Sequence, residues 1–170
     1  MIADVELLKS IFRYEPTTGK FFWLVDRSGG AHGGFVKARK GEEAGRVDPS
    51  NGYVRLRSGG RKWLAHRAAW MLAYGHAPVC HIDHINGIKT DNRLANLRDV
   101  DRSTNLQNRK AASAKNKSSG VLGVQARRGK FMAVISVDGK SRILGTYTTA
   151  EAAHEQYVTA KRQLHAGNTL

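Results

Sequence analysis

Turn-forming residues divide this chain into short segments. Because each segment is long enough only for a short strand or helix, the spacing of the turns limits the folds that the chain can adopt. Turns are indicated at Pro16-Thr17-Thr18-Gly19, Ser58-Gly59-Gly60, Arg128-Gly129 and Asp138-Gly139, each beside a stretch with the composition of a short strand. Asp-Gly in particular is typical of tight hairpins. No run of 18 apolar residues is present, so no membrane span is expected. Together these features predict an α+β protein built of small sheets and helices.

Residues 1–65 are predicted to form a small helix and hairpin region. Its expected elements are a helix over 4–13, a strand over 20–25, a glycine-rich basic loop over 26–51, and a hairpin with strands over 52–57 and 61–65. Arg55 and Arg57 alternate onto one face of the hairpin, with Val54 and Leu56 on the other. The arginines could therefore follow a phosphate backbone, although a half-solvated hairpin would also explain them.

Three further parts are predicted after this region. Residues 66–110 open with a helix over 66–74 that ends near Gly75, residues 111–119 form a basic linker, and residues 120–167 form a C-terminal module. The module is expected to have strands over 121–125, 130–137 and 141–147. A helix should follow, beginning with a capping box at residues 148–151 and ending at Gly167, with one apolar face formed by Ala153, Tyr157, Ala160 and Leu164. Its middle strand should turn one face to the helix, with Lys130, Met132, Val134 and Ser136 on the other.

The charge of the chain favours a polyanionic partner. Lys and Arg number 28 against 14 Asp and Glu, which gives a net charge of +14. Each phosphate that such a protein neutralises releases condensed counterions, so a nucleic acid is the expected partner. Ribosomal, membrane-surface and secreted proteins can be equally basic. A single cysteine, Cys80, excludes an internal disulfide and a multi-cysteine zinc site, and the absence of a signal peptide predicts a cytoplasmic protein.

The stretch from Val79 to Arg109 carries the candidate chemistry. Phosphodiester hydrolysis needs a base for water, a neutralised phosphate and a stabilised leaving oxygen. Asp and Asn supply oxygen ligands for a hard cation, and a neutral imidazole is a suitable base near pH 7. A strand ending near His84, a returning strand over 96–100 and a helix capped by Ser103 and running through Arg109 could press Asn105 towards Asp83.

Residues 81–109 resemble the HNH endonuclease ββα-metal motif of phage and intron-encoded homing nucleases. The resemblance rests on Asp83-His84, Asn86-Gly87, the string Thr90-Asp91-Asn92-Arg93, Asn96-Leu97 and Asn105, with the lead-in His66-Arg67 … Trp70. It implies that Asp83 and Asn105 bind one divalent metal, Mg²⁺ or Mn²⁺, that His84 is the general base, and that Asn96 holds the loop and orients the histidine through backbone hydrogen bonds. Asn105 stands where many members have a final histidine. An accessory role, a metal contact and a phosphate contact all stay open for His81, and Cys80 is expected to be buried beside the site.

Residues 118–165 resemble an AP2-type DNA-binding domain of three strands and one helix. The similar strings are Ser119-Gly120-Val121, Gly123-Val124, residues 130–135, Leu144-Gly145-Thr146-Tyr147 and Glu151-Ala152-Ala153. The family usually has a tryptophan where this chain has Phe131-Met132. By this resemblance the sheet enters a DNA groove.

The combined prediction is a metal-dependent endonuclease of phage or bacterial-host type that needs no small-molecule cofactor. As a monomer with one site it would nick duplex DNA, and a dimer could cut both strands. The basic residues predicted to contact DNA are Arg55, Arg57, Arg98, Arg102, Arg109, Lys115, Lys117, Arg127, Arg128, Lys130, Lys140 and Arg142. The alternatives are a catalytically inactive sequence-specific DNA-binding protein and a structural RNA-binding protein.

Overall fold

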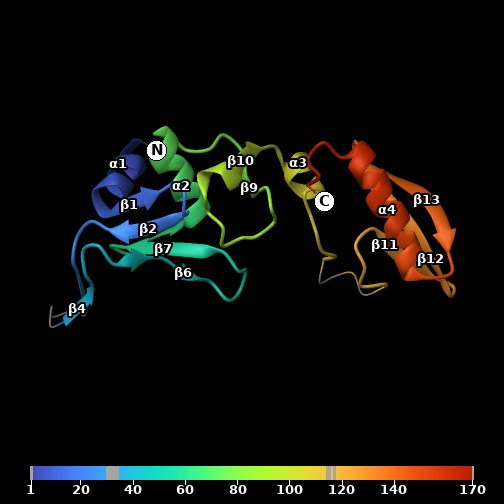
Figure 1. Cartoon of the computed structure of the whole chain (residues 1–170), viewed down its shortest axis with the longest axis horizontal. Coiled ribbons are helices and arrows are strands. Elements are labelled where there is room, and N and C mark those ends of the chain that lie inside the picture. Colours follow the sequence, from blue (N-terminus) through green and yellow to red (C-terminus); the bar gives the residue numbers. More distant parts are fainter. Residues whose placement is uncertain (1, 30–34, 114–115, 117, 170) are drawn as a thin grey trace. The chain divides into compact units, whose positions relative to one another are not determined.

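The computed structural model describes residues 2–29, 35–113, 116 and 118–169, in a mixed α+β fold of two compact units (Figure 1). The units comprise Met1–Val100 and Asp101–Leu170. Their boundary falls within the part predicted over 66–110, so the four-part division of the chain stays a prediction. Lys115 and Lys117, both predicted DNA contacts, lie outside the described residues. Among the helices of the described ranges, none has the length and apolar character needed to cross a membrane.

The N-terminal unit begins with a helix packed on a three-stranded sheet. Helix α1 (Ile2–Ile11) is followed by β1 (Phe12–Glu15) and β2 (Lys20–Trp23), and the sheet order is β1-β2-β5 with β5 at Glu43–Ala44. The predicted helix ends two residues early because Phe12 starts β1, where its ring lies 4.7 Å from that of Trp23. Val5 and Leu8 of α1 are buried in the same core.

Residues 26–51 do not form the predicted loop. Their described part contains β3 (Arg27–Gly29), β4 (Phe35–Ala38), β5 and β6 (Arg46–Val47). These strands pair with each other or with neighbours: β3 with β4, β5 with β2, and β6 with β7. The prediction failed because pairing satisfies the backbone hydrogen bonds of these segments, whereas their glycine-rich sequence has no alternating pattern.

The predicted hairpin and the helix after it are confirmed. Strands β7 (Val54–Ser58) and β8 (Arg61–Leu64) pair with β6 in the order β6-β7-β8. Leu56 is fully buried in the core. Helix α2 (Ala65–Tyr74) ends at Gly75, which has a φ of 76° and donates its N–H to the Met71 carbonyl. Glycine is favoured at this left-handed position because it has no Cβ.

The remaining elements of the N-terminal unit form an antiparallel pair. Strand β9 (His81–His84) is joined to β10 (Leu97–Val100) by a loop that ends in a short 3-10 helix, η1 (Leu94–Asn96). In the C-terminal unit, α3 (Arg102–Gln107) follows directly in the sequence. Its N-cap is Asp101 rather than Ser103, because the Asp101 carboxylate accepts the Thr104 N–H at 2.9 Å. The helix ends before Arg109, which corrects the predicted range.

The C-terminal unit has a three-stranded antiparallel sheet with one face covered by a helix (Figure 1). The sheet comprises β11 (Val124–Arg127), β12 (Lys130–Val137) and β13 (Lys140–Tyr147), and the helix is α4 (Ala150–Leu164). Both predicted two-residue turns are present, with left-handed Arg128 (φ 52°) and Asp138 (φ 51°) before their glycines. This backbone conformation matches the twist of the flanking strands.

Four details of this unit differ from the predictions. The first strand starts at Val124 rather than Val121. The N-cap of α4 is Thr149, whose hydroxyl accepts the Ala152 N–H, so the capping box predicted over residues 148–151 does not form. Leu164 is 42% exposed, and the side chain of Lys161 lies buried instead, with its ammonium donating to the Arg109 carbonyl. The helix ends at Leu164, before Gly167, which donates its N–H to the Gln107 side chain.

Candidate active site

Four buried polar side chains surround the end of β9. Asp83, His84, Asn92 and Asn96 are each between 2% and 7% exposed. The pairing with β10 places Asp83 opposite Arg98 and His84 opposite Leu97. Upstream, the Asp99 carboxylate accepts the backbone N–H groups of Val79 and Cys80 and so fixes the entry into β9. Buried polar groups need such partners, since an unpaired one is costly.

The ring of His84 is oriented by Asn92. His84 Nε2 lies 3.3 Å from Asn92 Oδ1, and Asn92 Nδ2 donates to the Thr90 carbonyl at 3.2 Å. That second bond fixes the amide with its oxygen towards the imidazole. Nε2 therefore carries the proton in the neutral ring, and the lone pair is on Nδ1.

Two aromatic rings enclose the same imidazole. The His66 ring lies edge-on at 5.1 Å and the Tyr53 ring at 5.9 Å. Burial lowers the pKa of His84 from its ordinary value, while the hydrogen bond that His84 donates to Asn92 and the nearby Asp83 act in the opposite direction. Burial also lowers the pKa of His66, to about 3. Both histidines are thus neutral near pH 7, and a neutral His84 can accept a proton.

Asn96 closes the loop between the two strands. Its Oδ1 accepts the Asn86 backbone N–H at 2.9 Å, and its Nδ2 donates to Asn86 Oδ1 and to the Asp91 carbonyl. Asp91 in turn accepts two hydrogen bonds from the Arg93 guanidinium, at 2.8 and 2.6 Å. These bonds lower the pKa of Asp91 to about 2. Side-chain hydrogen bonds therefore fix the path of the loop, and the role of Asn96 in the reaction stays a prediction.

Asp83 is paired with Arg98. Nε and Nη2 of Arg98 donate to Asp83 Oδ2 at 3.0 and 2.8 Å. Such a two-fold contact is stronger than a neutral hydrogen bond. Arg98, predicted to contact phosphate, thus lies next to the predicted metal ligand, and its contact with DNA stays a prediction.

The donors at this site suit a hard divalent cation. Within the described residues, no group of three or more His, Cys, Asp or Glu side chains is placed to hold a metal. The predicted ligand set has only one carboxylate, from Asp83, and one amide, from Asn105. Carboxylate and amide oxygens fit Mg²⁺, which takes few protein ligands and keeps several waters. Asp83 belongs to the N-terminal unit and Asn105 to α3 of the C-terminal unit, so their joint site stays a prediction.

Two residues near the candidate site are exposed, whereas Asp83 and His84 are buried. Cys80 is exposed, which corrects the predicted burial, and it lies before β9 where its backbone N–H is held by the Asp99 carboxylate. His81 is also exposed, at the start of β9. No described contact assigns it to metal or phosphate.

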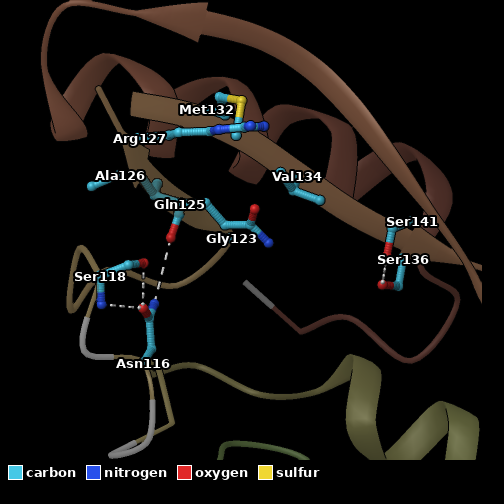
Figure 2. Close-up of a pocket in the computed structure, with 11 residues that line it drawn as sticks. Asn116, Ser118, Gly123, Gln125, Ala126, Arg127, Met132, Val134, Ser136 and Ser141 are labelled. Carbon is cyan, nitrogen blue, oxygen red and sulfur yellow. Dashed lines mark hydrogen bonds between the residues drawn. The ribbon is translucent and has the colours of Figure 1, made fainter. Parts of the chain in front are cut away.

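The open face of the C-terminal sheet borders a hollow of about 510 Å³. Figure 2 shows Met132 and Val134 of β12 and Gln125 and Arg127 of β11 beside it. The pairing sets Gln125 opposite Met132 and Arg127 opposite Lys130, so these four share a face. Gln125 was not among the predicted contacts.

The other predicted basic contacts of this unit are placed differently. The register sets Lys140 opposite Val137 and Arg142 opposite Ile135, on the side of the sheet that faces α4 rather than on its open face, and both side chains are exposed. A bulge between Ala133 and Val134 shifts the alternation and could not be predicted from the sequence. Exposed positions are occupied by Arg102, Arg109 and Arg128.

Sequence reasoning missed three residues of the candidate site. Asn92 was noted only as part of the loop string and had no role of its own, and His66 and Tyr53 had no assigned role. The string Thr90-Asp91-Asn92-Arg93 marked the loop, but only the path of the loop brings the Asn92 amide to His84. The lead-in His66-Arg67 was a signal that could have pointed to His66.

Comparison with known proteins agrees with this location. Residues 64–107 match the HNH endonuclease family. No curated protein matches the chain. Among solved structures, one described as "DNA binding and cleavage by the HNH homing endonuclease I-HmuI" is 19% identical, with a TM-score of 0.43 over 96% of this chain and 92% of that chain.

Proposed function

We propose that this protein is a metal-dependent DNA endonuclease that hydrolyses phosphodiester bonds in duplex DNA and nicks as a monomer. The observation that carries the proposal is the buried pair Asp83-His84 at the end of β9, with Asn92 fixing the imidazole, inside the segment that matches the HNH endonuclease family. The excess of basic residues supports a nucleic-acid substrate.

In this proposal His84 is the general base. Nδ1 of the neutral ring takes a proton from water, whose oxygen forms the new bond to phosphorus while the bond to the leaving O3′ breaks. Asn92 holds the ring and Asn96 holds the loop that carries Asn92. Asp83 and Asn105 would hold Mg²⁺ or Mn²⁺, which when bound neutralises charge on the phosphate and stabilises the leaving oxygen. An AP2-like C-terminal sheet, through its open face, would supply contacts to the DNA.

Cleavage of supercoiled plasmid tests the proposal. Wild type should give open circles with Mg²⁺ or Mn²⁺ and none with EDTA, and His84→Ala should lower the rate by roughly 10²–10⁴-fold. Its matched control is His76→Ala, which removes an exposed histidine outside the motif. Asp83→Ala should also stop cleavage while DNA binding in EDTA persists.

The outcomes separate the alternatives. Cleavage by His84→Ala at the wild-type rate would remove His84 from the mechanism. Linear product would indicate paired sites in a dimer. Binding without cleavage of any DNA, including a sequence selected for binding, would favour the inactive DNA-binding protein.

A further inference from the structure

A second basic region of the N-terminal unit lies outside the HNH segment. It consists of Arg46, Arg55, Arg57 and Lys62 on β6, β7 and β8, and is called the β7 basic face below. Register sets Arg46 directly opposite Arg55 and Arg57 directly opposite Lys62. Directly opposed residues of antiparallel strands project to the same side, so the four cations share one face.

This arrangement is unfavourable for the fold unless an anion compensates it. Like charges directly opposite each other destabilise a sheet. Asp48 pairs with Arg55 at 2.7 Å, and a hydrogen bond from the Ser50 hydroxyl lowers the pKa of Asp48 and keeps it charged. Within the described residues, no carboxylate forms an ion pair with Arg46, Arg57 or Lys62.

The β7 basic face borders an open cleft. The cleft has a volume of about 620 Å³ and is lined by the arginines at 27, 46, 55 and 57 together with Trp23, Glu43 and Asp48. Its carboxylates are already engaged, Glu43 by Lys20 at 2.8 Å and Asp48 by Arg55. Arg27 stacks on Trp23 at 4.6 Å and donates to the Arg57 carbonyl. The cleft therefore keeps a positive excess that suits an anionic ligand.

The face also starts beside the candidate active site. Tyr53 precedes β7, and its ring lies 5.9 Å from that of His84. Arg55 and Arg57 follow at about 7 and 13 Å along the extended strand. Lys89, from the loop after β9, places its ammonium 4.9 Å from the Tyr53 ring. Cationic side chains are thus spaced along one strand that starts beside His84. A continuous polyanion with a phosphate near His84 could contact them in succession.

We propose that the β7 basic face binds the sugar–phosphate backbone of duplex DNA next to the bond that is cut. The proposal rests on the proposed function for its choice of DNA. Arg46 and Lys62 join the arginines of β7 as backbone contacts, and binding compensates the cross-strand repulsion that the free protein carries. Such contacts add affinity without preference for sequence.

A charge-matched pair of triple variants tests this face. The first variant is Arg46→Gln, Arg57→Gln and Lys62→Gln. The control is Lys9→Gln, Arg13→Gln and Arg61→Gln, which removes the same net charge from cations that are each paired with a carboxylate. Arg61 precedes Lys62 on β8 and projects to the opposite side.

Binding is measured by fluorescence anisotropy of labelled duplex DNA in EDTA over a range of salt concentrations. The face variant should flatten the slope of log K against log salt by about 2–3, at about 0.9 per phosphate, for every sequence. Its free energy of unfolding should be unchanged or raised, because like charges are removed. The control should leave the slope within about 1 of wild type.

An unchanged slope in the face variant, or equal losses in both variants, would show a solvated face and overturn the proposal. A loss confined to duplex RNA would do the same. Because EDTA prevents metal-dependent cleavage, the result is independent of catalysis. A flattened slope in a protein that never cuts DNA would keep the β7 basic face and refute the proposed function.

Discussion

The two units place their polar side chains in opposite ways. Around β9 of the N-terminal unit, Asp83, His84 and Asn92 are buried and each is held by a specific partner. On the C-terminal sheet, Gln125 and Arg127 are exposed, and the buried apolar residues Val124, Ala133 and Ile135 belong to the core shared with α4. Fixed polar groups suit a reaction that needs one geometry, whereas exposed side chains suit adjustable contacts to a surface. Substitutions in the first region should therefore change rate, and those in the second should change affinity.

Asn92 offers the sharpest test of the buried region. Asn92→Ala should lower the cleavage rate by about 10²-fold with DNA affinity retained, because the imidazole loses its orientation. Asn92→Asp keeps the acceptor and adds a negative charge, which raises the pKa of His84 and should move the acid limb of the pH–rate profile up by about one unit. Rates from pH 5 to 9 measure both. If Asn92 had only a structural role, the acid limb of the pH–rate profile of Asn92→Asp would lie at the same pH as in wild type.

Gly123 tests whether the core of the C-terminal unit is independent of the first region. Gly123 has a φ of 75°, and an added Cβ would lie 2.1 Å from the Tyr157 ring. Gly123→Ala should destabilise this unit by about 3 kcal/mol, from overpacking and backbone strain together. Gly129→Ala is the control, with a φ of 72° but no neighbour within 4 Å, and should cost about 1 kcal/mol.

Two probes distinguish the units in that experiment. All three tryptophans, Trp23, Trp63 and Trp70, belong to the N-terminal unit, so their fluorescence reports on it alone. In urea, circular dichroism should reveal an early transition in Gly123→Ala, with the fluorescence midpoint unchanged. Coincident shifts of both signals would show that the units unfold together.

His66 should make the buried region acid-sensitive. Its pKa is lowered from 6.5 to about 3 by burial, so between these values the unfolded chain binds one more proton than the folded protein. The free energy of unfolding should therefore fall as pH decreases through that window, by up to about 1.4 kcal/mol per pH unit. His66→Phe should remove the His66 contribution and so make this slope shallower in the tryptophan-detected transition, and His76→Phe, at an exposed site, should leave the slope as in wild type. Equal slopes in both variants would contradict a buried neutral His66.

Substitution of Arg127 on the C-terminal sheet should have the smallest effect of these changes. Arg127→Ala should weaken binding to duplex DNA and flatten the salt slope by about 1 if its guanidinium neutralises one phosphate. The cleavage rate at saturating DNA should not change. Arg142→Ala is the matched control, since Arg142 lies on the other face by register, and anisotropy titrations compare the two. A larger loss in Arg142→Ala would reverse the assignment of the two faces.

Local features of the sequence predicted much of the fold. The β7–β8 hairpin, α2 and the two turns of the C-terminal sheet were confirmed, because alternation, glycine positions and helix stops act within a few residues. Asp83 and His84 could be placed at a strand end for the same reason. The prediction of a loop over residues 26–51 was wrong, since short strands that are held by partners elsewhere in the chain show no clear pattern in their own sequence.

What the sequence alone determined is the set of chemical groups and the local elements that carry them. Only the tertiary structure decided that the Asn92 amide reaches His84, that Arg98 pairs with Asp83, and that Arg46 opposes Arg55. Each of these contacts depends on strand register or on the path of a loop. Register and loop path are fixed by packing between residues far apart in the chain, and no periodicity of a single segment encodes them.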